Sequence, residues 1–309
     1  MKRRSFLPLL PMAAWAEGKA PQIFSLAFHP GGKVLALGGY KDVRLADAAT
    51  GNATTTLPGH AENVRGLAFS PDGRRLAAVG GLPGRKGELK IWDVEGKSVA
   101  ATIQGHSDSI YAVAWSADGK SVATSSYDKF IKLWDAASGK EIRTLKDHID
   151  AVYSLAFTPD GKRLVSGAAD RAVKIWNPET GERLFTLSEP LDGINSIALD
   201  PGGKFVAAGG LDKTLRIWSL GDRGGELVNT LIAHEDAILQ VAWSPDGNTL
   251  VSASADKTIK VFEAKSLTER KSISGQPDWV MALRFSPDGK HFAAGRYDGS
   301  LTIYDLGKL

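Results

Sequence analysis

The side chains best suited to chemistry are histidines that recur along the chain. Four of the six histidines occupy matching places in a repeated stretch of sequence: His60, His106, His148 and His234. Clustered histidines can bind a metal ion, and a histidine beside a serine and an aspartate can activate a hydroxyl nucleophile. Both chemistries require the side chains to converge on one point.

The repeat spacing argues against both. Equivalent positions in separate repeats point to similar places in separate sheets, and no H-x-x-x-H or His-plus-carboxylate spacing appears. The glycine-rich stretch at 81–87, GLPGRKG, lacks the phosphate-loop pattern and a following helix. No G-x-S-x-G elbow is present either. We therefore expect no catalytic residue, no metal site and no cofactor.

Composition is that of a globular protein. Of 309 residues, 43% are hydrophobic and 24% are charged, and none is cysteine, which excludes disulfides and thiolate metal sites. No apolar run is long enough to span a bilayer. The net charge of +3 comes from Lys2, Arg3 and Arg4, because residues 17–309 carry 35 basic and 35 acidic side chains. We expect no membrane insertion and no nucleic-acid partner.

The elements that must position these residues come from a sevenfold repeat. One turn signature recurs as HPGG, SPDG, SADG, TPDG, DPGG, SPDG and SPDG, starting at residues 29, 70, 116, 158, 200, 244 and 286. Each turn joins a short strand such as SLAF or AVAW to another such as RLVSGA. A third strand ends at Ala46, Trp92, Trp134, Trp176, Trp218, Phe262 or Tyr304, and a fourth precedes the next unit.

A four-stranded sheet with two apolar faces cannot bury both faces alone. Seven such sheets at a period near 42 residues therefore predict a ring of radially packed blades. The expected fold is all-β: a seven-bladed β-propeller of four-stranded antiparallel blades over residues 17–309. An N-terminal strand is a candidate for the fourth strand of the last blade, which would close the ring.

The repeats resemble those of the WD-repeat β-propeller family over roughly residues 21–309. Trp92-Asp93 and Trp134-Asp135 match the family's Trp-Asp pair, and Gly59-His60 and Gly105-His106 match its Gly-His pair.

That resemblance implies a structural role for the recurring polar residues. In the family, the histidine, a Ser or Thr, an Asp and the Trp form a hydrogen-bonded tetrad. Carried over by position, the tetrads are His106, Thr124, Asp128 and Trp134; His148, Ser166, Asp170 and Trp176; and His234, Ser252, Asp256 and Phe262, the last without an indole. Such a network stabilises only when every member is satisfied.

Other copies depart from the pattern. The fifth has Pro190 and Ala208 at the His and Ser positions, and the seventh has Gln276 and Ala294, so each loses the polar pair together. The second keeps His60 and Trp92 but has Ala78. Its loop at 81–87 is a candidate contact with a partner or a harmless surface insertion.

Residues around the start of each first strand, and before each turn Asp, should gather on the face that WD-repeat proteins present to partners. The first of these two sets is Phe24, Arg65, Tyr111, Tyr153, Asn195, Leu239 and Met281. Many are aromatic, as is common at protein interfaces. The hypothetical partner-binding face consists of Phe24, Tyr40, Arg65, Tyr111, Tyr127, Tyr153, Trp279, Met281 and Tyr297. The alternative is that several of them pack between blades.

The first sixteen residues allow two interpretations. Arg3-Arg4-Ser5-Phe6-Leu7 resembles a twin-arginine export pattern, and Ala14-Trp15-Ala16 offers a signal-peptide cleavage site before a mature start at Glu17. Alternatively, Pro11 to Ala16 stand where a fourth strand would complete the seventh blade. We favour export, which accounts for all sixteen residues.

The sequence thus predicts a non-enzymatic, monomeric scaffold that binds partner proteins or peptides through one propeller face, in the periplasm or secreted. It is cytoplasmic if residues 1–16 are retained. An enzyme or cofactor-binding protein that uses the central channel is the alternative, and it needs carboxylates or histidines converging near the axis.

Overall fold

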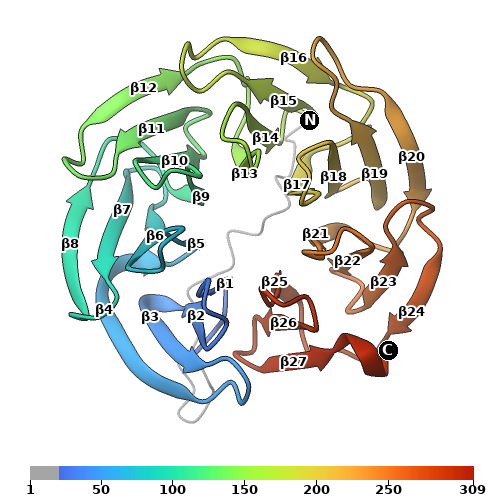
Figure 1. Ribbon diagram of the computed structural model, residues 1–309, viewed down its shortest axis with the longest axis horizontal. Coiled ribbons are helices and arrows are strands. Elements are labelled where there is room, and N and C mark those ends of the chain that lie inside the picture. Colours follow the sequence, from blue (N-terminus) through green and yellow to red (C-terminus); the bar gives the residue numbers. More distant parts are fainter. Residues whose placement is uncertain (1–20) are drawn as a thin grey trace.

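The computed structural model of the protein describes residues 21–309, which form seven antiparallel sheets arranged around one axis (Figure 1). This architecture confirms the predicted seven-bladed β-propeller. In every sheet the strands neighbour each other in chain order, and the first strand of each is the innermost.

The first three blades contain twelve strands. Blade 1 is β1 (Ser25–Phe28), β2 (Val34–Gly38), β3 (Tyr40–Asp47) and β4 (Ala53–Asn63). Blade 2 is β5 (Gly66–Phe69), β6 (Arg75–Leu82), β7 (Lys86–Asp93) and β8 (Ser98–Ile103). Blade 3 is β9 (Ile110–Trp115), β10 (Ser121–Ser126), β11 (Ile131–Asp135) and β12 (Glu141–Leu145).

The next three blades repeat the pattern. Blade 4 is β13 (Val152–Phe157), β14 (Leu164–Ala168), β15 (Val173–Trp176) and β16 (Arg183–Leu187). Blade 5 is β17 (Ile194–Leu199), β18 (Phe205–Gly210), β19 (Thr214–Ser219) and β20 (Leu227–Ile232). Blade 6 is β21 (Ile238–Trp243), β22 (Thr249–Ser254), β23 (Ile259–Glu263) and β24 (Glu269–Ile273).

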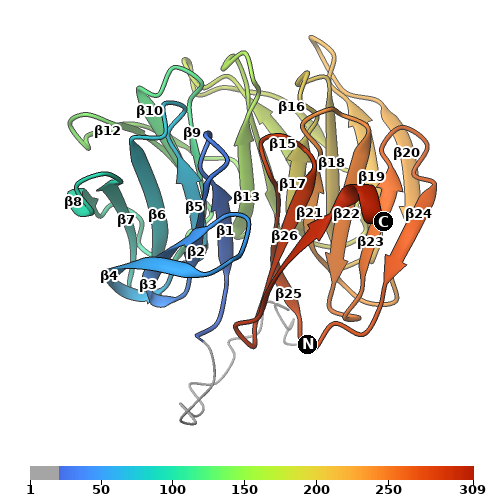
Figure 2. The same cartoon turned by 60° about the horizontal axis from the view of Figure 1, so that its bottom comes forward.

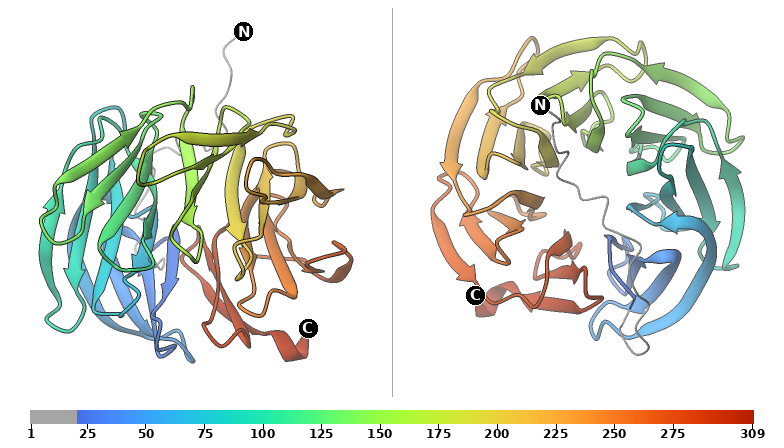
Figure 3. Two further views of the ribbon diagram at one scale, coloured as in Figure 1. Left: turned by 45° about the horizontal axis from the view of Figure 1, so that its top comes forward. Right: turned by 180° about the vertical axis from the view of Figure 1, so that it is seen from behind.

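Within residues 21–309, blade 7 has three strands: β25 (Val280–Phe285), β26 (His291–Arg296) and β27 (Leu301–Asp305), followed by the 3-10 helix η1 (Leu306–Lys308). Blade 7 lies beside blade 1, which closes the ring (Figure 3). Pro11 to Ala16, the alternative closing strand, and the export signal at residues 1–16 lie outside the described residues.

The repeated turn explains why each first strand reverses into the second. In SADG, the Ser116 hydroxyl donates to Asp118 Oδ1 at 2.6 Å and accepts from the Ser121 amide at 2.9 Å. Gly119 closes the turn at φ +69°, a conformation that glycine adopts without a steric penalty. The hairpin is therefore specified by four residues.

The core consists of seven apolar clusters, and each joins two neighbouring blades. Trp134 of blade 3 packs against Val79, Leu89 and Ile91 of blade 2 within one such cluster, and Trp176 packs between blades 3 and 4 in the next. The last cluster joins Leu26 and Leu35 of blade 1 to blade 7. Figure 2 shows the strands of successive blades standing face to face around the axis. The blades thus bury one another's faces.

The stretch at 81–87 is mostly strand rather than a long loop, which corrects its interpretation. Gly81 pairs with Gly87 and Leu82 with Lys86, so β6 and β7 extend as a hairpin with only three residues at its tip. The Gly84 amide at the tip donates to Asp108 Oδ1 at 2.8 Å. This bond ties the hairpin to the loop before blade 3.

Candidate functional site

One pocket lies where the seven innermost strands begin. It takes one residue from around the start of the first strand of each blade: Phe24, Arg65, Tyr111, Tyr153, Asn195, Leu239 and Met281, with Gln240 as an eighth. The sevenfold repeat delivers these side chains to one place, because each blade presents the same strand end to the axis. All of these residues except Gln240 occupy the repeat position that the sequence predicts to lie on this face.

On one side of the pocket a cation lies among tyrosines. The Arg65 guanidinium lies 4.7 Å from the centre of the Tyr111 ring. The Tyr111 ring in turn meets Tyr153 at 5.0 Å, edge to face, and lies 6.3 Å from Tyr127. Tyr127 is 38% exposed, whereas Tyr153 is 9% exposed. Tyr127 therefore lies at the solvent-exposed edge of this group, and Tyr153 lies at its buried end.

On the other side three aromatic rings follow one another. Phe24 meets Tyr297 at 6.1 Å between ring centres, and Tyr297 lies 6.3 Å from Trp279. Phe24 is almost buried, while Trp279 and Tyr297 are half-buried. Tyr40, which the sequence analysis placed on the same face, is not among the pocket residues, and its ring lies 4.8 Å from Lys41 Nζ.

The tyrosine hydroxyls of the pocket are protonated at neutral pH and are therefore available as hydrogen-bond donors. Burial raises the pKa of Tyr111 and, more strongly, that of Tyr153. A phenol whose pKa rises stays protonated, so both groups keep their O–H. Neither phenol hydroxyl has a hydrogen bond to another side chain or backbone group of residues 21–309.

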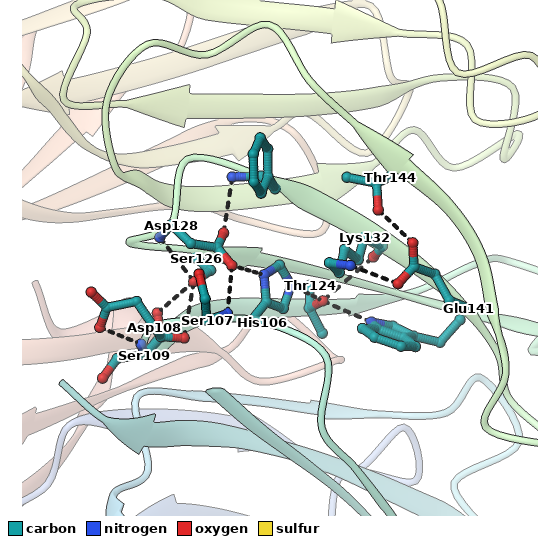
Figure 4. A network of polar contacts seen from close by, with 12 residues as sticks. His106, Ser107, Asp108, Ser109, Thr124, Ser126, Asp128, Lys132, Glu141 and Thr144 are labelled. Carbon is teal, nitrogen blue, oxygen red and sulfur yellow. Dashed lines mark hydrogen bonds and ion pairs between the residues drawn. The ribbon is translucent and has the colours of Figure 1, made fainter. Parts of the chain in front are cut away.

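The recurring histidines lie away from this pocket, in separate networks between blades. His106 Nδ1 lies 2.9 Å from Asp128, His106 Nε2 lies 2.8 Å from Thr124, and the Trp134 indole donates to Thr124 at 2.8 Å (Figure 4). The structure therefore brings together the four residues assigned to this tetrad.

The second and third tetrads have the same geometry. His148 lies 2.8 Å from both Asp170 and Ser166, and the Trp176 indole donates to Ser166 at 2.8 Å. In blade 6, His234 lies 3.0 Å from Asp256 and 2.7 Å from Ser252, and Phe262 replaces the indole. All three histidines are buried.

The networks assign the protons. The aspartate can only accept, so the histidine carries its proton on Nδ1, and Nε2 accepts from the hydroxyl, which in turn accepts from the indole. Burial lowers the pKa of His148 and His234, which favours this neutral form. In the first two tetrads, each buried between blades, the Ser or Thr hydroxyl donates to the histidine and accepts from the indole. The hydroxyl is therefore a structural link between the two side chains.

Two blades that lack the tetrad satisfy their polar groups differently. In blade 5 the Trp218 indole donates to Glu189 at 2.9 Å, beside Pro190 and Ala208. In blade 7 the buried Arg296 donates to Gln276 at 3.0 Å and to the Tyr304 hydroxyl at 2.9 Å. Neither Glu189 nor Arg296 was predicted from the sequence, although Glu189 adjoins a tetrad position and Arg296 lies two residues from one.

Blade 2 is the exception. Both ring nitrogens of the buried His60 and the indole nitrogen of Trp92 have no hydrogen-bond partner among the described residues, because Ala78 supplies no hydroxyl. Glu88 replaces the aspartate in part, since it accepts from the Ala61 amide at 3.2 Å and pairs with Lys90 at 2.9 Å. Burial lowers the pKa of His60 to about 4.

Within residues 21–309, no group of three or more histidine or acidic side chains is placed to hold a metal ion. No helix in that part of the chain is both long and apolar enough to cross a membrane.

Comparisons with known proteins match the repeats. A family model described as the IFT122 first beta-propeller matches residues 151–308, about half of the chain. A second, described as the WD domain, G-beta repeat, matches residues 51–93 and 97–135. Among individual proteins, Coronin-7 of Bos taurus is 40% identical over 81 residues, and Coronin-7 of Mus musculus is 44% identical over 64 residues. These matches cover 26% and 20% of the chain but only 8% and 7% of the Coronin-7 chains.

We predict that Ala78→Ser stabilises the protein. The new hydroxyl can donate to His60 and accept from Trp92, so unsatisfied buried groups gain partners, which should raise the free energy of unfolding by about 1–3 kcal/mol. The control is Ala208→Ser in blade 5, where no histidine is present and the indole is already bonded. Equal effects of the two substitutions in chemical denaturation would contradict this explanation.

We also predict that His60 makes the fold sensitive to mild acid. The pKa of the histidine is 6.5 in the unfolded chain and about 4 in the folded protein. Below pH 6.5 the unfolded chain therefore binds a proton that folded His60 does not bind. The free energy of unfolding is at its full value above pH 6.5 and falls as the pH drops from 6.5 to 4. At pH 5 the loss from His60 should be about 2 kcal/mol relative to pH 7.5. Denaturation of wild type and His60→Phe at both pH values measures it, and an equal loss in both proteins would exclude His60 as the cause.

Proposed function

The chain belongs to the WD-repeat β-propeller family, and on that premise we propose that it is a non-enzymatic scaffold that binds partner proteins or peptides. The binding surface is the face on which the innermost strands begin. The observation that carries the proposal is the convergence of residues from all seven blades on one pocket, flanked by half-buried aromatic rings. Tyrosine and tryptophan are favoured at protein interfaces because they bury a large area at modest entropic cost.

The size of the pocket supports a peptide rather than a small-molecule ligand. Its volume is about 60 Å³, whereas sites for small molecules enclose about 300–1,000 Å³. A space of this size takes one side chain of a larger partner. The same face also exposes apolar side chains on the loops that lead into β13 and β17, where Ile149 and Leu191 are each 77% exposed.

The alternative, an enzyme or cofactor-binding protein that uses the central channel, finds less support. A channel active site would draw its groups from the innermost strands. In those strands, β1, β5, β9, β13, β17, β21 and β25, there is no histidine, aspartate or glutamate. The channel wall of the described residues therefore offers no general acid or base of these types.

We predict that the aromatic rings beside the pocket hold the partner. Replacing Trp279 and Tyr297 together by alanine removes two half-buried rings and should weaken binding by at least about tenfold, because aromatic anchors dominate interface energies. The control is Ile142→Ala, which removes an exposed apolar side chain from the outer strand β12. Partners are identified by mass spectrometry after co-purification from the native host, and an unchanged partner set and affinity for the double variant would overturn the proposed surface.

We further propose that the protein is exported and cleaved before Glu17, which rests on the twin-arginine-like pattern and the A-x-A site in residues 1–16. The intact mass of the protein from its native host should then correspond to a chain that starts at Glu17. A soluble cytoplasmic pool that retains Met1 to Ala16 would contradict export and favour a cytoplasmic scaffold.

A further inference from the structure

Among residues 21–309, the pocket lining contains one charged side chain, Arg65, and that charge has no ionic partner there. It forms no salt bridge and no side-chain hydrogen bond within the part of the chain that the structure describes; its recorded side-chain contact is the Tyr111 ring at 4.7 Å. The Arg65 guanidinium therefore lies over an aromatic ring, and its N–H donors have no hydrogen-bond partner among the described residues.

The surroundings of Arg65 add hydrogen-bond donors. The Tyr111 and Tyr153 hydroxyls and the Gln240 amide have no hydrogen bond to other groups of residues 21–309. Two carboxylates act on these tyrosines, Asp108 on Tyr111 and Asp150 on Tyr153, and Oδ1 of each already accepts backbone amides. The pocket thus presents a cation beside neutral donors.

The innermost strands add no acid that could pair with Arg65. Their one charged residue is Arg284 on β25, whose guanidinium donates to the carbonyl of its own neighbour, Leu283, at 2.7 Å. The equivalent residue in the other six blades is alanine: Ala27, Ala68, Ala114, Ala156, Ala198 and Ala242. An anionic group that enters the pocket therefore meets no carboxylate on these strands.

We propose that this pocket recognises a carboxylate of the bound peptide, and that Arg65 is the residue that pairs with it. This inference rests on the proposed peptide-binding function and names the chemical group of the peptide that the pocket selects. The carboxylate is an aspartate or glutamate side chain or the peptide's C-terminal carboxylate. A planar guanidinium edge pairs with a carboxylate through two parallel hydrogen bonds, and one guanidinium matches its single negative charge.

The test is selection of peptides from a random display library, half of it ending in a free C-terminus and half in a blocked one. The full chain and three variants are compared: Arg65→Gln, Arg65→Lys and Arg171→Gln. Arg171 is exposed on a loop of the same face and is not part of the pocket, so its replacement makes the same change in charge as Arg65→Gln. Thermal unfolding checks that all variants fold.

We expect the wild type and Arg171→Gln to enrich peptides with a fixed Asp, Glu or free C-terminus, and Arg65→Gln to lose that enrichment. Enrichment confined to one half of the library separates a C-terminal carboxylate from a side chain. For a selected peptide, converting its carboxylate to an amide and replacing Arg65 by Gln should each weaken binding by about 10- to 100-fold, with little further loss when combined. Arg65→Lys should bind at an intermediate level.

Three results would overturn the inference. Selected peptides without a fixed carboxylate, or equal selection by Arg65→Gln, would refute it while leaving the peptide-binding surface intact if binding still depends on Trp279 and Tyr297. Tighter binding of a phosphoserine version than of the carboxylate peptide would assign the pocket to phosphate instead. Failure to select any peptide whose binding depends on Trp279 and Tyr297 would refute the proposed function itself.

Discussion

Burial of one blade by the next is the constraint on which the rest of this structure depends. Each sheet has apolar side chains on both faces, and a single four-stranded sheet would leave both faces in water. The seven clusters that join neighbouring blades, such as the one containing Val79, Leu89 and Trp134, remove this exposure all the way round the ring. Because every blade is held on both sides, its innermost strand is fixed in position and direction. The pocket at the axis follows from that, since seven strand ends meet there.

The polar networks are a consequence of the same packing. A large indole such as Trp134 or Trp176 fills an interface between blades and carries one N–H that must find an acceptor. In blades 3 and 4 a hydroxyl provides it, and the hydroxyl is supported by a histidine and an aspartate. In blade 5 Glu189 provides it directly, and blade 7 uses an arginine network instead. In blade 2, the His60 ring nitrogens and the Trp92 indole have no partner among the described residues, so the packing tolerates an incomplete network there.

Much of this could be predicted from the sequence because the repeat places each residue type seven times. The turns, the strands and the ring follow from short-range pattern, and so does the position of Tyr111 and Phe24 at the strand ends. The three tetrads follow from the resemblance to the WD-repeat family, carried over by repeat position. What could not be predicted depends on contacts between different loops. The partner of Trp218 is a glutamate outside the repeat pattern, the 81–87 hairpin is extended by pairing across Gly81 and Gly87, and the isolation of Arg65 emerges only when its neighbours are placed.

The central claim is that the histidines link blades and that recognition takes place elsewhere, at the pocket on the axis. The most direct measurement, by nitrogen-15 NMR of the full chain, is the tautomer of His106, His148 and His234 together with the titration of His148 and His234. The structure predicts a proton on Nδ1 in all three rings, and a pKa below that of a free histidine for His148 and His234. A proton on Nε2 instead, or titration of His148 or His234 near pH 6.5 as for a solvent-exposed histidine, would contradict it.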